Sequence, residues 1–129
     1  NLTPSNLSIC NDWNFEDRTK LKIITIDPNG CKDFDDAIGI EETNRGIKVS
    51  VYIANVSIWL EWLELWELAS GLPSTIYLPD KIIPMLNELL SNNTCSLIEG
   101  RKRPTLVMDI LLKKDLKIVH GFHLLFILN

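Results

Sequence analysis

The sequence predicts an α+β protein with a mixed, largely antiparallel sheet, several hairpins and a few helices. Two observations support this fold class. Short β-branched runs recur along the chain between clusters of turn residues, which is typical of strands joined in hairpins. One longer run, residues 57–71, places a glutamate at every third position among apolar residues, which favours a helix. With 129 residues, the chain is long enough for at most one ordinary domain.

Five β-branched runs are expected to be strands. They are Lys22–Ile26, Ala37–Glu42, Ile47–Ala54, Leu106–Leu112 and Ile118–Leu128. Turn residues at Thr43–Gly46 and at Lys113–Asp115 join the second run to the third and the fourth run to the fifth, so two hairpins are predicted. Along the third run Val49, Val51 and Ile53 fall on one face of the strand, and the residues between them fall on the other.

Two helices are expected. Ser57 is in position to cap a helix over Ile58–Ala69, and a second, short helix is predicted within Ile82–Leu90, after the extended stretch Pro73–Pro79. The polar side of the first helix consists of its glutamates, Glu61, Glu64 and Glu67. The rest of its surface, which includes three tryptophans, is wider than a surface helix needs. Burial against the remainder of a larger protein is the favoured interpretation, and a groove for a separate partner is the alternative.

Composition narrows the classes of function. The net charge of −4 argues against a protein coated with positive charge for general nucleic-acid binding, although a local basic groove stays compatible with it. The three cysteines form no CxxC pair and no Cys/His cluster, so neither a disulfide framework nor a zinc site is indicated, and a reduced, intracellular compartment is expected. No apolar run reaches the length of a membrane span, and no membrane association is expected.

The most informative segment holds four carboxylates within ten residues: Asp27, Asp33, Asp35 and Asp36. At ~5 Å and an effective dielectric constant of ~20, each ionised pair costs roughly 3 kcal/mol, so a hard divalent cation is a natural counter-charge. In an extended segment Asp33 and Asp35 project to one side, about 6.5 Å apart. The turn at Pro28–Gly30 can bring Asp27 beside them, whereas Asp36 points away unless the backbone bends. Such a group suits a two-metal site that clamps a phosphoryl group.

The acidic segment alone leaves other interpretations open. A lone Asp-x-Asp-Asp sequence is most often a solvated turn. A calcium loop is less favoured, because the glycine and distal glutamate of an EF-hand are missing. A phosphatase-type aspartate nucleophile is also disfavoured, because the Asp-x-Asp pair does not directly end a strand.

Resemblance to a known family extends beyond the aspartates. The segment from Thr25 to Ile38 resembles the signature of the RNB family of exoribonuclease catalytic domains. The run Val51–Ser57 is similar to the family's Val-His-Ile-Ala-Asp-Val-Ser, with Tyr52 and Asn55 as departures. A third block matches in order and approximate spacing: Ile76–Asp80, Ile83–Leu86, Leu89–Asn92 and Cys95–Leu97, followed by Arg103-Pro104.

The resemblance implies a processive 3′→5′ exoribonuclease that hydrolyses single-stranded RNA to nucleoside 5′-monophosphates. It places Asp27, Asp33, Asp35 and Asp36 on the family's acidic positions, which serve a pair of Mg²⁺ ions (Mn²⁺ being the alternative), with Asp35 closest to the hydrolytic step. It also places Tyr77 where an aromatic ring stacks on the 3′-terminal nucleotide, the alternative being an ordinary core tyrosine. Further partners implied are other RNA-decay proteins, in the cytoplasm or, for the exosome-nuclease branch, the nucleus.

The resemblance also predicts how much of the family's domain is present. Residues 1–18 are expected to be a lead-in segment, and residues 19–129 the N-terminal third of an RNB catalytic domain truncated at its C-terminus. The rest of that domain is expected to pack on the tryptophan-rich helix. A downstream arginine that the family uses on the phosphate is missing, so the fragment is expected to be inactive alone. The basic cluster Arg101–Arg103 is read as a solvated turn, with contact to the RNA backbone as the alternative.

Two rival functions remain at this stage. A non-catalytic remnant of an RNB domain would act as an RNA-binding or protein-binding module. An unrelated metal-binding domain would explain the aspartates but leave the other two blocks as coincidence.

Overall fold

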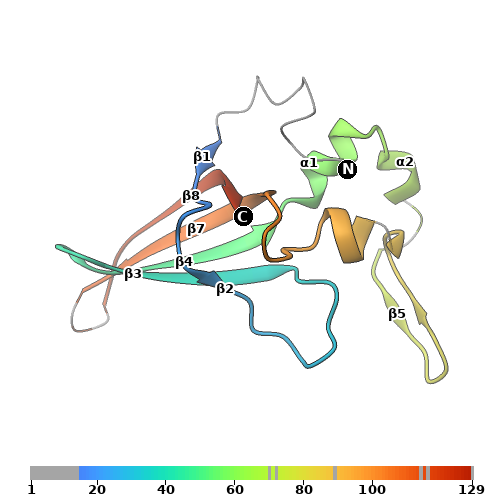
Figure 1. Ribbon diagram of the computed structural model, residues 1–129, viewed down its shortest axis with the longest axis horizontal. Coiled ribbons are helices and arrows are strands. Elements are labelled where there is room, and N and C mark those ends of the chain that lie inside the picture. Colours follow the sequence, from blue (N-terminus) through green and yellow to red (C-terminus); the bar gives the residue numbers. More distant parts are fainter. Residues whose placement is uncertain are drawn as a thin grey trace.

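The computed structural model describes residues 15–128 except 70, 72, 89, 114 and 116. Its elements are β1 (Glu16–Asp17), β2 (Ile23–Ile24), β3 (Asp36–Thr43), β4 (Gly46–Ala54), α1 (Val56–Trp62), α2 (Trp66–Ala69), β5 (Ile76–Tyr77), β6 (Ile82–Ile83), a π-helical turn (Leu90–Thr94), β7 (Arg103–Leu112) and β8 (Ile118–Leu128). A six-stranded sheet has the order β1-β8-β7-β4-β3-β2, and β5 pairs with β6 separately (Figure 1). The predicted α+β fold class is confirmed.

The two predicted hairpins form the centre of the sheet. Strands β3 and β4 are joined at Thr43–Gly46, and β7 and β8 pair from Arg103 to the end of β8. Gly46 must be glycine, because its φ is +139° and a Cβ there would lie 2.0 Å from the Leu112 carbonyl oxygen. Every pair in the sheet is antiparallel except β1 with β8. Strand β1 lies near the end of the expected lead-in segment, of which residues 1–14 are outside the described part.

The face of β4 that packs inward is not its most apolar one. Ser50, Tyr52 and Ala54 are buried, whereas Ile53, on the alternate face, is half exposed. Three more apolar side chains on β3 and β7 are also exposed: Ile40, Leu106 and Met108. The alternation along β4 is as predicted. The buried face of β4 is polar because a charged side chain from outside the two hairpins packs against it.

That group is Arg18, which is only 5% exposed. Its guanidinium donates to both carboxylate oxygens of Asp109 on β7, at 2.8 and 2.6 Å. The Ser50 hydroxyl donates to the same carboxylate at 2.6 Å, and the Tyr52 hydroxyl accepts from Arg18 at 3.4 Å. Burial acts to raise the pKa of Asp109, but the hydrogen bonds from Arg18 and Ser50 outweigh it and keep that pKa below its ordinary value. The network ties the segment after β1 to β4 and β7.

The predicted helix over Ile58–Ala69 is wrong as a single element. It breaks after α1, where Glu64 takes a left-handed backbone conformation with φ of 54°, and resumes as the short α2. The cap is Asn55 rather than Ser57, because the Asn55 side-chain oxygen accepts from the Ile58 backbone N–H. The Ser57 hydroxyl donates to that same oxygen at 2.7 Å. The three glutamates are exposed as predicted.

The tryptophans of this segment differ in exposure. Trp59 and Trp62 are buried within the chain itself, in a cluster with Ile58 and Cys95, with Phe15 packed against them. Trp66 is 50% exposed, and its indole N–H donates to Glu61 at 2.7 Å. Of the three, only Trp66 is therefore available for the contact expected with the rest of a larger domain.

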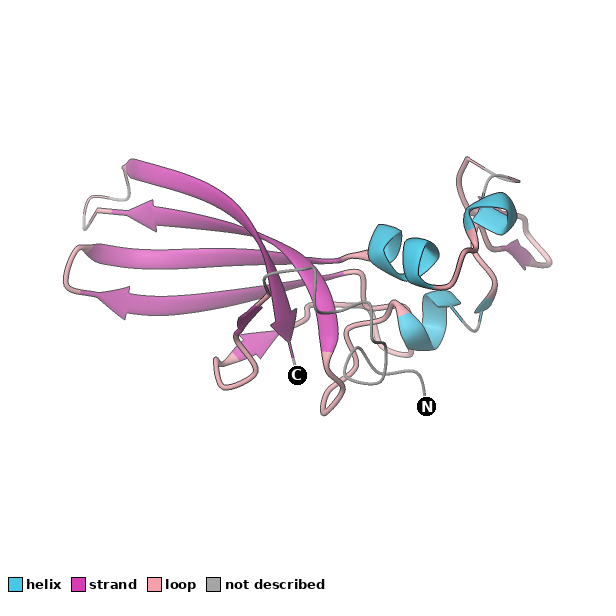
Figure 2. Ribbon diagram, turned by 90° about the horizontal axis from the view of Figure 1, so that it is seen from above, coloured by secondary structure: helices cyan, strands magenta, loops and turns pink. Residues whose placement is uncertain are grey.

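The helix predicted within Ile82–Leu90 is wrong over the first part of that stretch. Residues Ile82–Ile83 form β6, which pairs with β5 in a small hairpin, whereas Glu88 is helical and a π-helical turn begins at Leu90. The Leu78 N–H donates to the Lys81 carbonyl across the turn, and the Met85 N–H donates to the Thr75 hydroxyl. Pro84, which supplies no N–H, follows β6 directly. This hairpin and the helices lie beyond one end of the sheet (Figure 2).

Among the described residues, no helix is long and apolar enough to cross a membrane.

Replacing Asp109 by Ala is expected to destabilise the fold by about 3 kcal/mol or more, because it leaves the buried Arg18 guanidinium without its carboxylate. Urea unfolding at pH 7 measures the change in the free energy of unfolding. The matched control is Asp115→Ala, which removes an exposed ion pair with Lys117 and should cost less than about 1 kcal/mol. Equal losses in the two variants would contradict the structural role of the buried pair.

Candidate active site

The acidic segment forms a loop at the end of the sheet where the helices lie. It leaves β2, turns at Pro28–Cys31 and enters β3 at Asp36 (Figure 1). The Cys31 N–H donates to the Pro28 carbonyl at 3.1 Å, and Gly30 supplies the positive φ of 90° that the turn requires. At the other end of the loop the Ala54 N–H donates to the Asp35 carbonyl at 2.9 Å. The backbone is thus fixed on both sides of Asp33.

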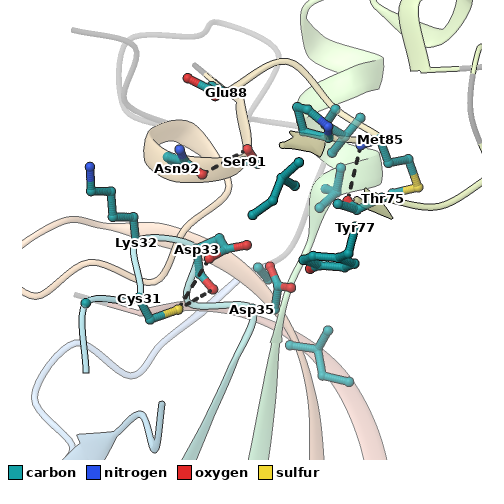
Figure 3. Close-up of a pocket in the computed structure, with 17 residues that line it drawn as sticks. Cys31, Lys32, Asp33, Asp35, Thr75, Tyr77, Met85, Glu88, Ser91 and Asn92 are labelled. Carbon is teal, nitrogen blue, oxygen red and sulfur yellow. Dashed lines mark hydrogen bonds between the residues drawn. The ribbon is translucent and has the colours of Figure 1, made fainter. Parts of the chain in front are cut away.

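Two of the four aspartates open into one cavity of about 560 Å³. Asp33 and Asp35 line it from the loop, and Tyr77, Ile82 and Met85 line it from the region of the β5–β6 hairpin. Figure 3 shows both carboxyl groups pointing into the space below the hairpin, with the Tyr77 ring close to Asp35. Tyr77 is 73% exposed, so it is not a core residue of the described part of the chain.

The environment of the Asp35 carboxyl disfavours its charged form. Partial burial raises the pKa of its carboxyl, and the neighbouring carboxylates of Asp33, Asp36 and Asp27 raise it further. One oxygen of Asp27, Oδ2, is buried and has no hydrogen-bond partner among the described residues. The site therefore holds more negative charge and more acceptor oxygens than its protein neighbours satisfy.

Cys31 lies among the same carboxylates. Its thiol donates to the Asp33 carboxylate at 3.3 Å and lies 4.0 Å from Asp27 Oδ1. The hydrogen bond to Asp33 raises the pKa of the thiol, which keeps Cys31 in its neutral form. The sequence analysis assigned no role to this cysteine.

The expected metal ligands are only partly brought together. Asp27 and Asp36 are not among the residues that line the cavity. Within the described ranges no group of three or more His, Cys, Asp or Glu side chains is arranged to hold a metal ion as it stands. The donor set still fits a hard divalent cation, because it consists of carboxylate oxygens and includes the unsatisfied Asp27 oxygen. The assignment of Asp27, Asp33, Asp35 and Asp36 as metal ligands stays a prediction.

Arg103 corrects the interpretation of the basic cluster. Arg101 and Lys102 are exposed, as a solvated turn requires, but Arg103 is only 5% exposed. Its guanidinium donates to the backbone carbonyls of Asn93, Ser96 and Lys102. It holds the chain between the π-helical turn and β7, so it is not presented to a ligand.

Ser96 also contacts the acidic loop. Its hydroxyl is hydrogen-bonded to the backbone of the acidic loop on both sides of Asp33. The only sequence signal was its place within the third matching block.

Comparisons with known proteins agree with this arrangement. The RNB domain family model matches residues 15–123. Ribonuclease R of Thermotoga maritima is 40% identical over 99 residues, which cover 75% of this chain and 14% of that protein. Exoribonuclease 2 of Buchnera aphidicola is 34% identical over 128 residues, which cover 98% of this chain and 20% of that protein.

Solved structures share the fold. RNase R of Mycoplasma genitalium, in complex with ribose-methylated single-stranded RNA, superposes with a TM-score of 0.77 at 28% identity, covering 99% of this chain and 22% of that one. Yeast Ssd1, described as a pseudonuclease, superposes with a TM-score of 0.76 at 17% identity, covering 100% of this chain and 16% of that one. The chain spans 14% to 20% of the length of the two curated relatives named above. By the match of the family model and by these identities, it belongs to the RNB domain family of ribonucleases.

Proposed function

We propose that this chain supplies the acidic half of the active site of a 3′→5′ exoribonuclease, which hydrolyses single-stranded RNA to nucleoside 5′-monophosphates. One observation carries the proposal: Asp33 and Asp35 share a cavity with an aromatic ring that is exposed and has no core role. A phosphodiester needs its negative charge balanced, and a terminal base needs an apolar surface. In this cavity the Asp33 and Asp35 carboxylates can hold the cations that balance the phosphate, and the Tyr77 ring offers the surface for the base.

In this proposal Asp27, Asp33, Asp35 and Asp36 hold Mg²⁺, with Mn²⁺ as the alternative ion. The bound cations would supply electrostatic stabilisation of the transferring phosphoryl group. Asp35 is proposed as the carboxylate closest to the hydrolytic step, as the family resemblance implies. Its place in the cavity beside Asp33 is compatible with that role. The pKa of Asp35 is raised because its surroundings disfavour the ionised carboxylate. A bound cation would offset that effect.

Tyr77 is proposed to stack on the 3′-terminal base. It pairs in register with Ile82 on β6, and both side chains line the cavity, so the hairpin offers a continuous apolar surface to one flat ring. Stacking is indifferent to base identity, which suits degradation of RNA of any sequence. RNase R of M. genitalium, a structural neighbour, is solved with both single-stranded and double-stranded RNA.

The chain is proposed to be inactive on its own. In the described part of the cavity the charged side chains are mainly acidic, with Lys32 as the cationic residue, so stabilisation of developing phosphate charge is weak. Losing one such interaction commonly costs about 10²–10³ in rate. The non-catalytic alternative is supported by the similarity to yeast Ssd1, since a fold shared with a pseudonuclease does not decide activity.

Asp35→Asn should raise the melting temperature of the metal-free chain by roughly 1–4 °C, because a neutral side chain relieves the partly screened repulsion. The same substitution should abolish stabilisation by Mg²⁺, which for the parent chain amounts to about 2.7 kcal/mol at 100 times the dissociation constant. Calorimetry with and without Mg²⁺ measures both effects. Equal stabilisation of parent and variant by Mg²⁺ would contradict the metal site.

Activity is tested by replacing the matching segment of T. maritima ribonuclease R with residues 15–123 of this chain. The folded chimera should shorten a 5′-labelled single-stranded RNA from its 3′ end in the presence of Mg²⁺, and Asp35→Asn in the chimera should reduce the rate at least about 10²-fold. The chain alone should leave the RNA intact. A folded chimera that binds the RNA without shortening it would favour the non-catalytic alternative.

Tyr77→Ala should weaken binding of a 5′-fluorescein-labelled oligoadenylate to the chain roughly 5–150-fold, which corresponds to the loss of one stacked base at about 1–3 kcal/mol. Fluorescence anisotropy measures the dissociation constant. Trp66→Ala is the matched control, because Trp66 is also an exposed aromatic residue but does not line the cavity. A larger loss in the control would place the RNA on the helical surface instead.

A further inference from the structure

We propose that Ser96 is the positioning residue of the acidic loop: its hydroxyl sets where the Asp33 and Asp35 carboxylates lie. The inference rests on the proposed function for the role of those carboxylates, but the geometry that it uses is independent of it. Ser96 lies 60 residues or more away from the loop in sequence and is 0% exposed. A side chain that is fully buried is not accessible to a substrate, so any effect of Ser96 on chemistry must pass through the loop.

The hydroxyl of Ser96 holds the backbone on both sides of Asp33. It accepts a hydrogen bond from the Phe34 N–H at 2.9 Å and donates one to the Lys32 carbonyl at 3.0 Å. The next residue adds a third bond, because the Leu97 N–H donates to the Phe34 carbonyl at 2.9 Å. The Ser96 side chain therefore bridges the backbone of the residues before and after Asp33.

Ser96 is itself held from the sheet. Arg103, at the start of β7, donates from Nε to the Ser96 carbonyl at 3.0 Å and from Nη2 to the Asn93 carbonyl at 2.8 Å. Strand β7 pairs with β4, whose last residue Ala54 donates to the Asp35 carbonyl. A closed path of hydrogen bonds thus connects Asp33 through Ser96, Arg103 and the two central strands back to Asp35. Exposed loops seldom have such support.

The support matters because of charge. The carboxylates of Asp33, Asp36 and Asp27 repel that of Asp35, so a loop without fixed backbone contacts would relax by moving the carboxylates apart. Displacements of about 1 Å in groups that bind a reacting substrate can cost about 10² in rate. Partners that orient a ligand without touching the metal typically contribute about 10–100-fold in metal affinity. Ser96 is placed to make that contribution.

The test compares Ser96→Ala, Ser96→Thr and the control Ser50→Ala in the 129-residue chain. Ser50 is an equally buried serine on β4. Its hydroxyl donates to Asp109 on β7 rather than to the acidic loop. Two quantities are measured: the dissociation constant for Mn²⁺ by electron paramagnetic resonance, and the hydrogen-exchange rate of the Phe34 amide without metal.

Ser96→Ala should weaken Mn²⁺ binding about 10–100-fold and speed exchange of the Phe34 amide about tenfold, while amides of β4 and β7 stay protected. Ser96→Thr, which keeps the hydroxyl, should restore both quantities toward the parent values. Ser50→Ala should lower the melting temperature but leave both quantities unchanged. If Ser96→Ala does not fold, Ser96→Cys replaces it, since its weak thiol donor should give a smaller change in the same direction.

Unchanged Mn²⁺ affinity or unchanged Phe34 exchange in a folded Ser96→Ala variant would overturn the inference. So would an equal loss of Mn²⁺ affinity in Ser50→Ala, because it would mark a general effect of stability. If the parent chain binds no Mn²⁺, the metal site of the proposed function fails. The positioning of the loop by Ser96 is then decided by the Phe34 exchange alone.

Discussion

The structure around the site answers one physical constraint: carboxylates that repel one another must be kept close together. Side chains alone cannot do this, since each aspartate gains by moving away from the others. The backbone does it instead, through the turn at Pro28–Cys31, the bond from Ala54 to Asp35 and the two bonds made by Ser96. The central sheet is thus the frame that resists the repulsion. The pKa of Asp35 is raised first by partial burial and then by the neighbouring carboxylates.

The frame itself contains a buried charge, and this shapes which face of the sheet is the core. Because Arg18 and Asp109 satisfy each other and bind Ser50 and Tyr52, the inner face can be polar without unpaired groups. The outer face keeps Ile40, Ile53, Leu106 and Met108 exposed. Apolar side chains gathered on one exposed sheet face mark a surface suited to contact with more protein. The chain's share of its relatives' length is consistent with such a contact.

Sequence reasoning succeeded where the signal is local. Alternation and turn residues identified the β3–β4 and β7–β8 hairpins, whose register depends on neighbouring residues. It failed for the long helix, because continuous helical patterning contains no mark of the left-handed residue Glu64. It failed for Ile82–Leu90, because pairing with β5 overrides the propensity of a nine-residue stretch. Ser96 escaped notice because its partners lie more than sixty residues away, and no periodicity encodes such contacts.

Asp33 and Asp35 belong to one segment and Tyr77 belongs to another, and the fold brings the two segments to the same cavity. The hairpin that carries Tyr77 is closed by the bond from the Leu78 N–H to the Lys81 carbonyl and by the bond from the Met85 N–H to the Thr75 hydroxyl. The loop that carries the aspartates is bonded to Ala54 of the sheet and to Ser96. In the proposed function, the acidic loop, which is anchored to the sheet, would receive the phosphate at the same place in each cycle of cleavage. The exposed Tyr77 ring would accept each new base, because stacking does not depend on base identity.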